Sequence, residues 1–137
     1  MTNILVTIRG VQEWEGEDVI HLVMPGTLHI DNTGSYITYD ETEETGMAGT
    51  TTTICVKGKK VEIIRTGTSK SVITLERGKR YDCEYQTPHG AMSISTIASE
   101  VKAYIGDSEG KVRAKYMITI GNQPSGENIF DISYKVV

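Results

Sequence analysis

Leucine and alanine, which dominate helical proteins, are scarce in this chain and together supply only nine of its 137 residues. No stretch keeps apolar residues at the i, i+3, i+4, i+7 spacing of an amphipathic helix. Isoleucine, valine and threonine, by contrast, supply 44 residues. These β-branched side chains lose rotamer freedom in a helix and pack well on a pleated strand. The composition therefore predicts an all-β protein.

Other features that the sequence lacks exclude whole classes of protein. Two cysteines, Cys55 and Cys83, are too few for a disulfide scaffold and are expected to be free thiols. No apolar run approaches the ~20 residues of a membrane helix, and the N-terminus lacks the basic and apolar segments of a signal peptide. The net charge of −4 argues against a nucleic-acid partner. We expect a cytoplasmic protein that binds neither membrane nor nucleic acid.

Apolar and polar residues alternate along most of the chain, and turn residues separate the alternating segments. The length suggests one domain over residues 1–137. The pattern predicts strands at Asn3–Gln12, Glu17–Met24, Leu28–Asp31, Tyr36–Glu41, Thr51–Lys57, Val61–Thr66, Ser71–Arg77, Arg80–Thr87, Ala91–Gly106, Lys111–Gly121 and Glu127–Val136.

The turns between these strands indicate how the strands are connected. Lys57–Lys60 and Arg77–Arg80 each carry a glycine and predict a pair of tight hairpins. Pro25-Gly26 is expected to bend one long strand rather than end it, and Ser99-Glu100 to kink another. Short turns imply an up-and-down meander, and closing the meander removes its exposed edges. We predict a closed antiparallel up-and-down β-barrel of about 8–10 strands, with a two-sheet sandwich as the alternative.

Arg65 interrupts an otherwise apolar face, which it shares with Val61 and Ile63. If that face points into the barrel, the guanidinium needs an acidic or tyrosyl partner. Glu41, in phase with Ile37 and Tyr39, is a candidate partner. Ile64 lies on the opposite face, so the sequence leaves the direction of Arg65 open.

Several short motifs, taken in order, resemble those of the YwiB-like proteins, an uncharacterised bacterial family of calycin (lipocalin-like) barrels. The matching residues are Asp18-Val19-Ile20 with Gly26, Tyr39–Glu43, Thr45–Thr50, Arg65-Thr66-Gly67, Glu76–Arg80, Tyr85–Gly90 and Glu127–Phe130. The resemblance spans nearly the whole chain. It implies an antiparallel calycin barrel and supplies little about function.

Catalytic and metal-binding patterns are missing. His21, His29 and His89 match no metal-ligand spacing, and a zinc site needs three or four converging donors. No nucleophile elbow or comparable signature occurs. We therefore assign no catalytic residue, no metal ligand and no cofactor.

A small-molecule site is the preferred functional hypothesis. The chain has seven tyrosines and one phenylalanine, and a wall that buries rings while keeping hydroxyls requires polar partners. Pro88 and Gly90 predict a rigid turn that presents residues at a barrel rim. The predicted ligand is small and partly apolar, or a carboxylate. The predicted ligand-binding residues are Arg65, Glu41, Tyr39, Tyr85, Thr87, His89, Tyr81 and Tyr116.

Two other functions remain open at this point. The first is a structural or protein-interaction domain without catalysis, which would pair through a barrel face as a homodimer. The second, less favoured, is an enzyme that uses Arg65 or Glu41 as a polarising or acid–base group in a dry barrel.

Overall fold

The structure is a computed structural model of the 137-residue chain. It describes every residue except 13–17, 43–47, 69, 88–89 and 122, and it does not describe the side chains of 10–12, 18–21, 85–87 and 125. The predicted all-β class is confirmed, because every regular element in the described residues is a strand.

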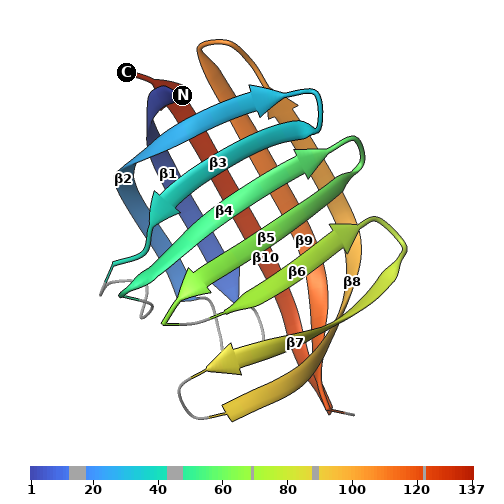
Figure 1. The fold of residues 1–137 in the computed structure, drawn as a ribbon. Coiled ribbons are helices and arrows are strands. Elements are labelled where there is room, and N and C mark those ends of the chain that lie inside the picture. The colour runs from blue at the N-terminus through green and yellow to red at the C-terminus, as the bar shows by residue number, and fades with distance from the viewer. Residues whose placement is uncertain (13–17, 43–47, 69, 88–89, 122) are drawn as a thin grey trace.

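Ten strands form one antiparallel sheet (Figure 1). They are β1 (Thr2–Gln12), β2 (Asp18–Asp31), β3 (Gly34–Asp40), β4 (Thr50–Lys57), β5 (Lys60–Gly67), β6 (Ser71–Glu76), β7 (Arg80–Thr87), β8 (Gly90–Ile105), β9 (Glu109–Ile120) and β10 (Gln123–Val136). The order across the sheet is β6-β5-β4-β3-β2-β1-β10-β9-β8-β7. The first and last strands of the chain are therefore neighbours inside the sheet, and β6 and β7 are its two ends.

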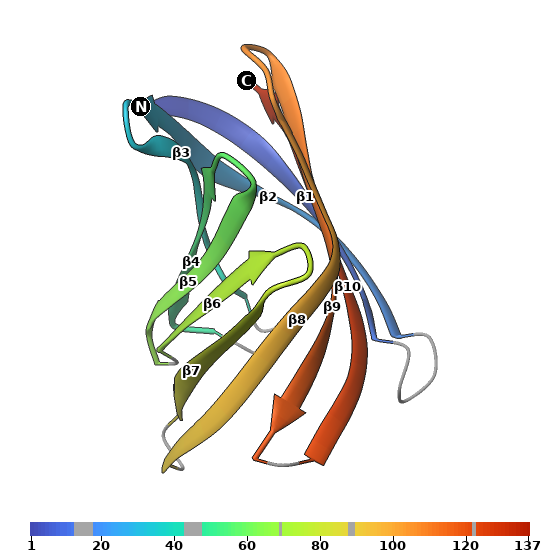
Figure 2. The ribbon, with the colours of Figure 1, turned by 90° about the vertical axis from the view of Figure 1, so that its right-hand side faces the viewer.

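The sheet curls until its two ends approach each other. In Figure 1, β3–β6 lie in front of β8–β10, and Figure 2 shows the same two walls from the side. The result is a nearly closed barrel, which confirms the predicted fold. We call the place where β6 and β7 meet the seam.

The predicted hairpin at Arg77–Arg80 is wrong in one respect, because β6 and β7 form no ladder with each other. The turn is instead attached to β8. The Gly78 N–H donates to the Ala98 carbonyl (2.9 Å), and the Thr96 hydroxyl donates to the Thr74 carbonyl (3.0 Å). These contacts hold the seam together near the turn, while β6 and β7 remain without mutual strand pairing.

The two predicted strand irregularities are confirmed. β2 continues through Pro25 and Gly26 and merges two predicted strands into one. A Cβ on Gly26 would lie 2.7 Å from the Thr38 carbonyl oxygen, so only glycine allows β3 to approach this closely. In β8 the register shifts between Ala98 and Glu100, as a bulge does.

The barrel interior is filled mainly by aliphatic side chains from the inward phase of each strand. Fully buried examples are Ile4, Val6, Ile37, Ile54, Val61, Ile63, Leu75, Val112 and Ile132. The predicted inner face of β9 holds at Val112, Ala114 and Tyr116, but Ile120, the last residue of β9, is 40% exposed. Among the described residues, no helix has the length and apolar character needed to cross a membrane.

Candidate functional site

A row of polar residues crosses the inner face from β3 to β6. The strand register places Tyr39 opposite Thr52, Thr52 opposite Arg65, and Arg65 opposite Ser71. Directly opposed residues of neighbouring strands point to the same face of a sheet. The four side chains therefore follow one another across the wall and reach the seam at Ser71.

The direction of Arg65, which the sequence left open, follows from its neighbours on β5. Val61 and Ile63 are 1% and 0% exposed, and Arg65 continues their phase. It is less buried than they are, because β5 ends two residues later at Gly67. Arg65 therefore lies at the edge of the apolar interior, close to one end of the barrel.

Glu41 follows directly after β3 and is 7% exposed. Its N–H donates to the Thr50 carbonyl (2.8 Å), which fixes the backbone against β4. The Thr52 hydroxyl donates to Glu41 Oε1 at 2.8 Å. Glu41 Oε2 is buried and has no hydrogen-bond partner among the described residues. The Tyr39 hydroxyl nevertheless lies close enough to Glu41 for a hydrogen bond that helps to raise the pKa of Tyr39, so this carboxylate has a second donor nearby.

The pKa values of two buried tyrosines, Tyr39 and Tyr116, are affected by nearby charged side chains in this part of the interior. Burial, followed by the negative charge of Glu41, raises the pKa of the Tyr39 hydroxyl, while the Arg65 charge opposes the rise. Burial also raises the pKa of Tyr116, and Arg65 again opposes it. Because Tyr116 lies on β9, the Arg65 charge acts on both walls of the barrel. Four predicted site residues are thus brought together: Arg65, Glu41, Tyr39 and Tyr116.

Two donors at the seam end of the row are unpaired. Arg65 Nε and Ser71 Oγ are both buried without a hydrogen-bond partner among the described residues. No ion pair within 4 Å joins Arg65 to an acid in the described part of the chain. Buried polar groups are normally hydrogen-bonded, and leaving a buried donor without a partner opposes folding by about 1–3 kcal/mol. These atoms are therefore suited to a partner from outside the chain.

A cavity of about 470 Å³ adjoins these donors. It lies where β6 and β7 diverge, since residues of both strands line it together with the end of β5. The lining residues are Ile64, Arg65, Thr66, Lys70, Ser71, Val72, Cys83 and Glu84. The missing β6–β7 ladder explains why the wall is hollow at this point.

The remaining predicted site residues lie elsewhere or outside the described part of the structure. The Tyr81 hydroxyl donates to Glu76 Oε1 (2.8 Å), and no contact with Arg65 is recorded among the described residues. Tyr85 and Thr87 belong to β7 by their backbone, but their side chains lie outside the described part. His89 lies outside the described residues.

Sequence reasoning missed Thr52, Lys70 and Ser71. Thr52 is in phase with buried Ile54, and Ser71 with buried Ile73 and Leu75, so alternation alone would have placed both hydroxyls inside. Their position next to Arg65 depends on strand register, which alternation does not give.

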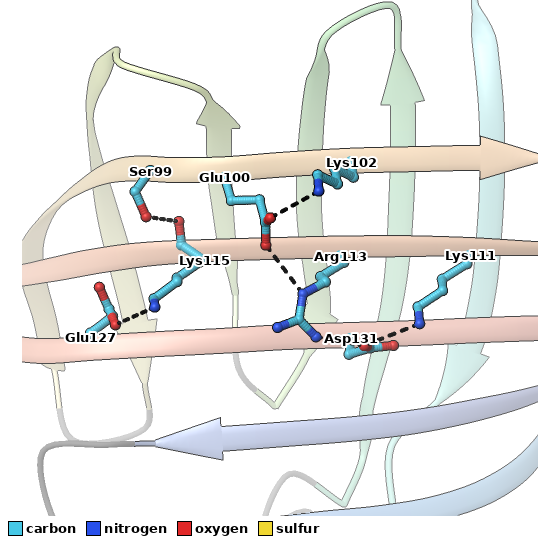
Figure 3. A network of polar contacts seen from close by, with 8 residues as sticks. All are labelled: Ser99, Glu100, Lys102, Lys111, Arg113, Lys115, Glu127 and Asp131. Atoms are coloured by element: carbon cyan, nitrogen blue, oxygen red, sulfur yellow. Dashed lines mark hydrogen bonds and ion pairs between the residues drawn. The ribbon is translucent and has the colours of Figure 1, made fainter.

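A second group of polar residues lies on the outer face of β8–β10 (Figure 3). Glu100 contacts Lys102 and Arg113, each at 3.2 Å, and Arg113 reaches Asp131 at 3.1 Å. Hydrogen bonds from Lys102 and then Arg113 lower the pKa of Glu100. These charges satisfy one another at the surface, so they support the sheet modestly and make a poor binding site.

An outer hollow of about 470 Å³ also occurs over β1, β2 and β8–β10, where Leu5, Val23 and Tyr104 are exposed. None of the unpaired buried atoms lines it, so the seam cavity is the stronger candidate. The homodimer suggested by the sequence stays a prediction. Across the described residues, no three His, Cys, Asp or Glu side chains gather as metal ligands would.

Comparison with known proteins gives a family and a fold. A family model described as "Domain of unknown function (DUF1934)" matches residues 6–132. The crystal structure of the ywiB protein from Bacillus subtilis superposes with a TM-score of 0.88 at 19% identity, covering 99% of this chain and 92% of that one. This confirms the predicted resemblance, and at that identity it shows the fold alone. No curated protein matches the chain.

Proposed function

The chain belongs to the family described as "Domain of unknown function (DUF1934)", and from its own residues we propose that it binds a small, partly apolar carboxylate in the seam cavity. The family description and the related fold supply no ligand. The proposal therefore rests on one observation. Arg65 and Ser71, two neighbouring donors with unpaired buried atoms, line a cavity of about 470 Å³.

The chemistry of the lining selects the ligand class. A guanidinium beside a hydroxyl offers several N–H and O–H donors to one oxyanion, and charge-assisted hydrogen bonds of this kind are the strong ones. Ile64, Val72 and Cys83 supply apolar surface for the rest of the ligand. The volume is within the usual range of small-molecule sites. Lys70 adds positive charge to the lining and Glu84 adds negative charge, so that with Arg65 the lining keeps a net positive charge, which favours the approach of an anion.

The first test measures binding of a panel of C4–C10 carboxylic acids by calorimetry and by thermal shift. We expect at least one acid to bind saturably at one site per chain. Arg65→Gln should weaken that binding by about 10- to 100-fold, because it removes hydrogen bonds to a charged group. The matched control is Arg80→Gln, since Arg80 is exposed and pairs with Asp82 (3.2 Å) away from the cavity. This control should leave the affinity unchanged.

The two free cysteines report where the ligand lies. Cys83 lines the cavity, whereas Cys55 is 1% exposed in the core. A bound carboxylate should slow alkylation of Cys83 and leave Cys55 unaffected. Equal affinities for the Arg65→Gln and Arg80→Gln variants, or alkylation of Cys83 unchanged at saturating ligand, would show that the seam cavity is not the carboxylate site.

A further inference from the structure

The seam cavity lies in the plane of the sheet rather than on one of its faces. Consecutive residues of a strand point to opposite faces, yet Ser71 and Val72 of β6, and Cys83 and Glu84 of β7, all line the same hollow. A hollow that both phases of two strands line is a gap between the edges of those strands. The edge of a strand presents main-chain N–H and C=O groups.

The main-chain groups of β6 that face this gap can be identified. In an antiparallel ladder each residue directs its N–H and C=O to one side, and successive residues alternate between the two sides. The Thr74 carbonyl accepts the hydroxyl of Thr96 from β8, so Thr74 faces the seam, and so does Val72, two residues away. Among the described residues β6 forms no ladder with β7. The N–H and C=O of Val72 are therefore directed into the gap.

The facing edge of β7 has the same orientation. Glu84 is opposite Ser93 in the β7–β8 register, and the Ser93 carbonyl accepts the N–H of Gly121, just after β9. Ser93 thus directs its main chain toward β9 and away from β7. Glu84, as the other member of this non-hydrogen-bonded pair, directs its main chain away from β8. Both strand edges therefore turn main-chain groups toward one gap.

One end of this gap suits a negative charge. Ser71 is 5% exposed, and its hydroxyl has no hydrogen-bond partner among the described residues. Arg65, directly opposite on β5, has its Nε in the same condition. With Lys70, the lining carries two positive charges against the one negative charge of Glu84. The gap thus places donors for an oxyanion beside the main-chain groups of a strand edge.

We infer that the carboxylate bound at the seam is the C-terminus of a short extended peptide, which adds to the edge of β6 as an extra strand. The main chain of the peptide pairs with Val72, and its terminal carboxylate meets Arg65 Nε and Ser71 Oγ. A peptide terminus supplies both kinds of group in one molecule, whereas a fatty acid leaves the strand edge unpaired. This inference rests on the proposed function, because it keeps the carboxylate at Arg65.

The first test compares matched compounds on the unaltered protein by calorimetry. Acetyl-alanyl-valine, acetyl-alanyl-leucine and acetyl-alanyl-phenylalanine are screened, and the tightest is set against its C-terminal amide and the two depsipeptides in which an ester oxygen replaces one amide N–H. We expect the C-terminal amide and at least one depsipeptide to bind at least about 5-fold more weakly, because a buried partner is then left unpaired. Failure of all three dipeptides to bind, or equal affinity for the dipeptide and both depsipeptides, would overturn the inference.

Substitution of Val72 then assigns the effect to the β6 edge. Val72→Pro removes the N–H that faces the gap, and because this N–H does not bond to β5, the β5–β6 ladder keeps its hydrogen bonds. The control Val72→Ala shortens the same side chain and keeps the N–H. The ratio of dipeptide to depsipeptide affinity should stay at about 5-fold or more in Val72→Ala and fall below about 2-fold in Val72→Pro. Equal ratios in the two variants would contradict pairing at Val72.

The two proposals fail in different ways. If plain carboxylates bind in an Arg65-dependent manner and the amide groups of the dipeptides add nothing, only the peptide inference is lost. If neither the plain carboxylates nor the dipeptides depend on Arg65, the proposed function is lost as well.

Discussion

At the scale of single residues, short hydrogen bonds within a turn have consequences that can be measured. Asp31 ends β2, and its Oδ1 accepts from the Thr33 N–H at 2.7 Å and from the Thr33 hydroxyl. The Thr33 hydroxyl, then its N–H, and lastly His29 lower the pKa of Asp31 from 3.8 to about 2. The carboxylate form therefore stabilises the β2–β3 turn.

The sign of the pH dependence follows from this lowered pKa. Asp31 binds a proton less readily in the folded than in the unfolded chain, so its contribution to stability is complete above about pH 4 and is lost as the pH falls toward 2. We expect an NMR titration to give Asp31 a pKa near 2. Thr33→Val should move that pKa toward 3.8. A pKa near 3.8 in the unaltered protein would contradict the turn geometry.

Arg65 and Ser71 represent the opposite case at the same scale. Arg65 Nε and Ser71 Oγ are buried and have no hydrogen-bond partner among the described residues, which opposes folding rather than supporting it. Proteins commonly retain such arrangements at sites of function, where stability is sacrificed. This is the physical reason to look for function at these residues rather than at the well-paired charges of the outer face.

At the scale of elements, close packing at strand ends limits which residues can occur. Gly110, at the start of β9, lies against the ring of Tyr134, whose hydroxyl donates to the Gly106 carbonyl (2.7 Å). A Cβ on Gly110 would be 2.3 Å from Tyr134 Cε2 and 2.6 Å from the Tyr104 carbonyl oxygen. The Tyr104 backbone and the hydrogen-bonded Tyr134 ring cannot both shift to make room for a methyl group at residue 110. The pairing of β8, β9 and β10 at this end therefore requires glycine.

Gly110→Ala should lower the free energy of unfolding by about 1–3 kcal/mol, the usual effect of overpacking. Urea denaturation of the variant measures it. The control is Gly58→Asn, because nothing lies within 4 Å of the Cβ position there and asparagine tolerates its φ of 61°. The control should change stability by no more than about 0.5 kcal/mol. Similar losses in both variants would exclude overpacking as the cause.

At the scale of the whole molecule, the barrel has one line of incomplete strand pairing, the seam between β6 and β7. β1, β9 and β10 each pair with strands on both sides, whereas β6 and β7 pair on one side only. The cavity opens along that line.

Amide hydrogen exchange should detect this incomplete pairing. Local openings span free energies from near zero up to that of global unfolding, and elements with few partners open first. We expect the amides of β6 and β7 to exchange on average at least about 100-fold faster than those of β1 and β10. A carboxylate ligand should slow exchange in β6 and β7 selectively. Equal protection of the β6, β7 and β1 amides would show that the strands at the seam open no more readily than fully paired strands.

Much of the fold could be predicted from the sequence because side-chain alternation is a local property. The strands from Thr50 to Thr87 end within a residue of their predicted limits, and the Pro25-Gly26 bend and the Ser99-Glu100 kink both occur. The β6–β7 pairing was predicted wrongly, because a glycine-containing turn fixes a reversal of the chain but not the ladder that follows it. The sequence predicts Arg65, Glu41, Tyr39 and Tyr116 as site residues, and these four stay predictions; Thr52 and Ser71, which the register places beside Arg65, are not among the predicted residues.

The sequence by itself determined that the chain is all-β, where its strands lie and which side chains alternate, since β-branched composition and period-2 patterning act between near neighbours. Only the tertiary structure decided that Arg65 points inward, that Ser71 and Thr52 flank it, and that β6 and β7 separate to leave a cavity. Those facts depend on register and on closure of the sheet. Both are set by contacts between residues far apart in the chain, where local patterns carry no information.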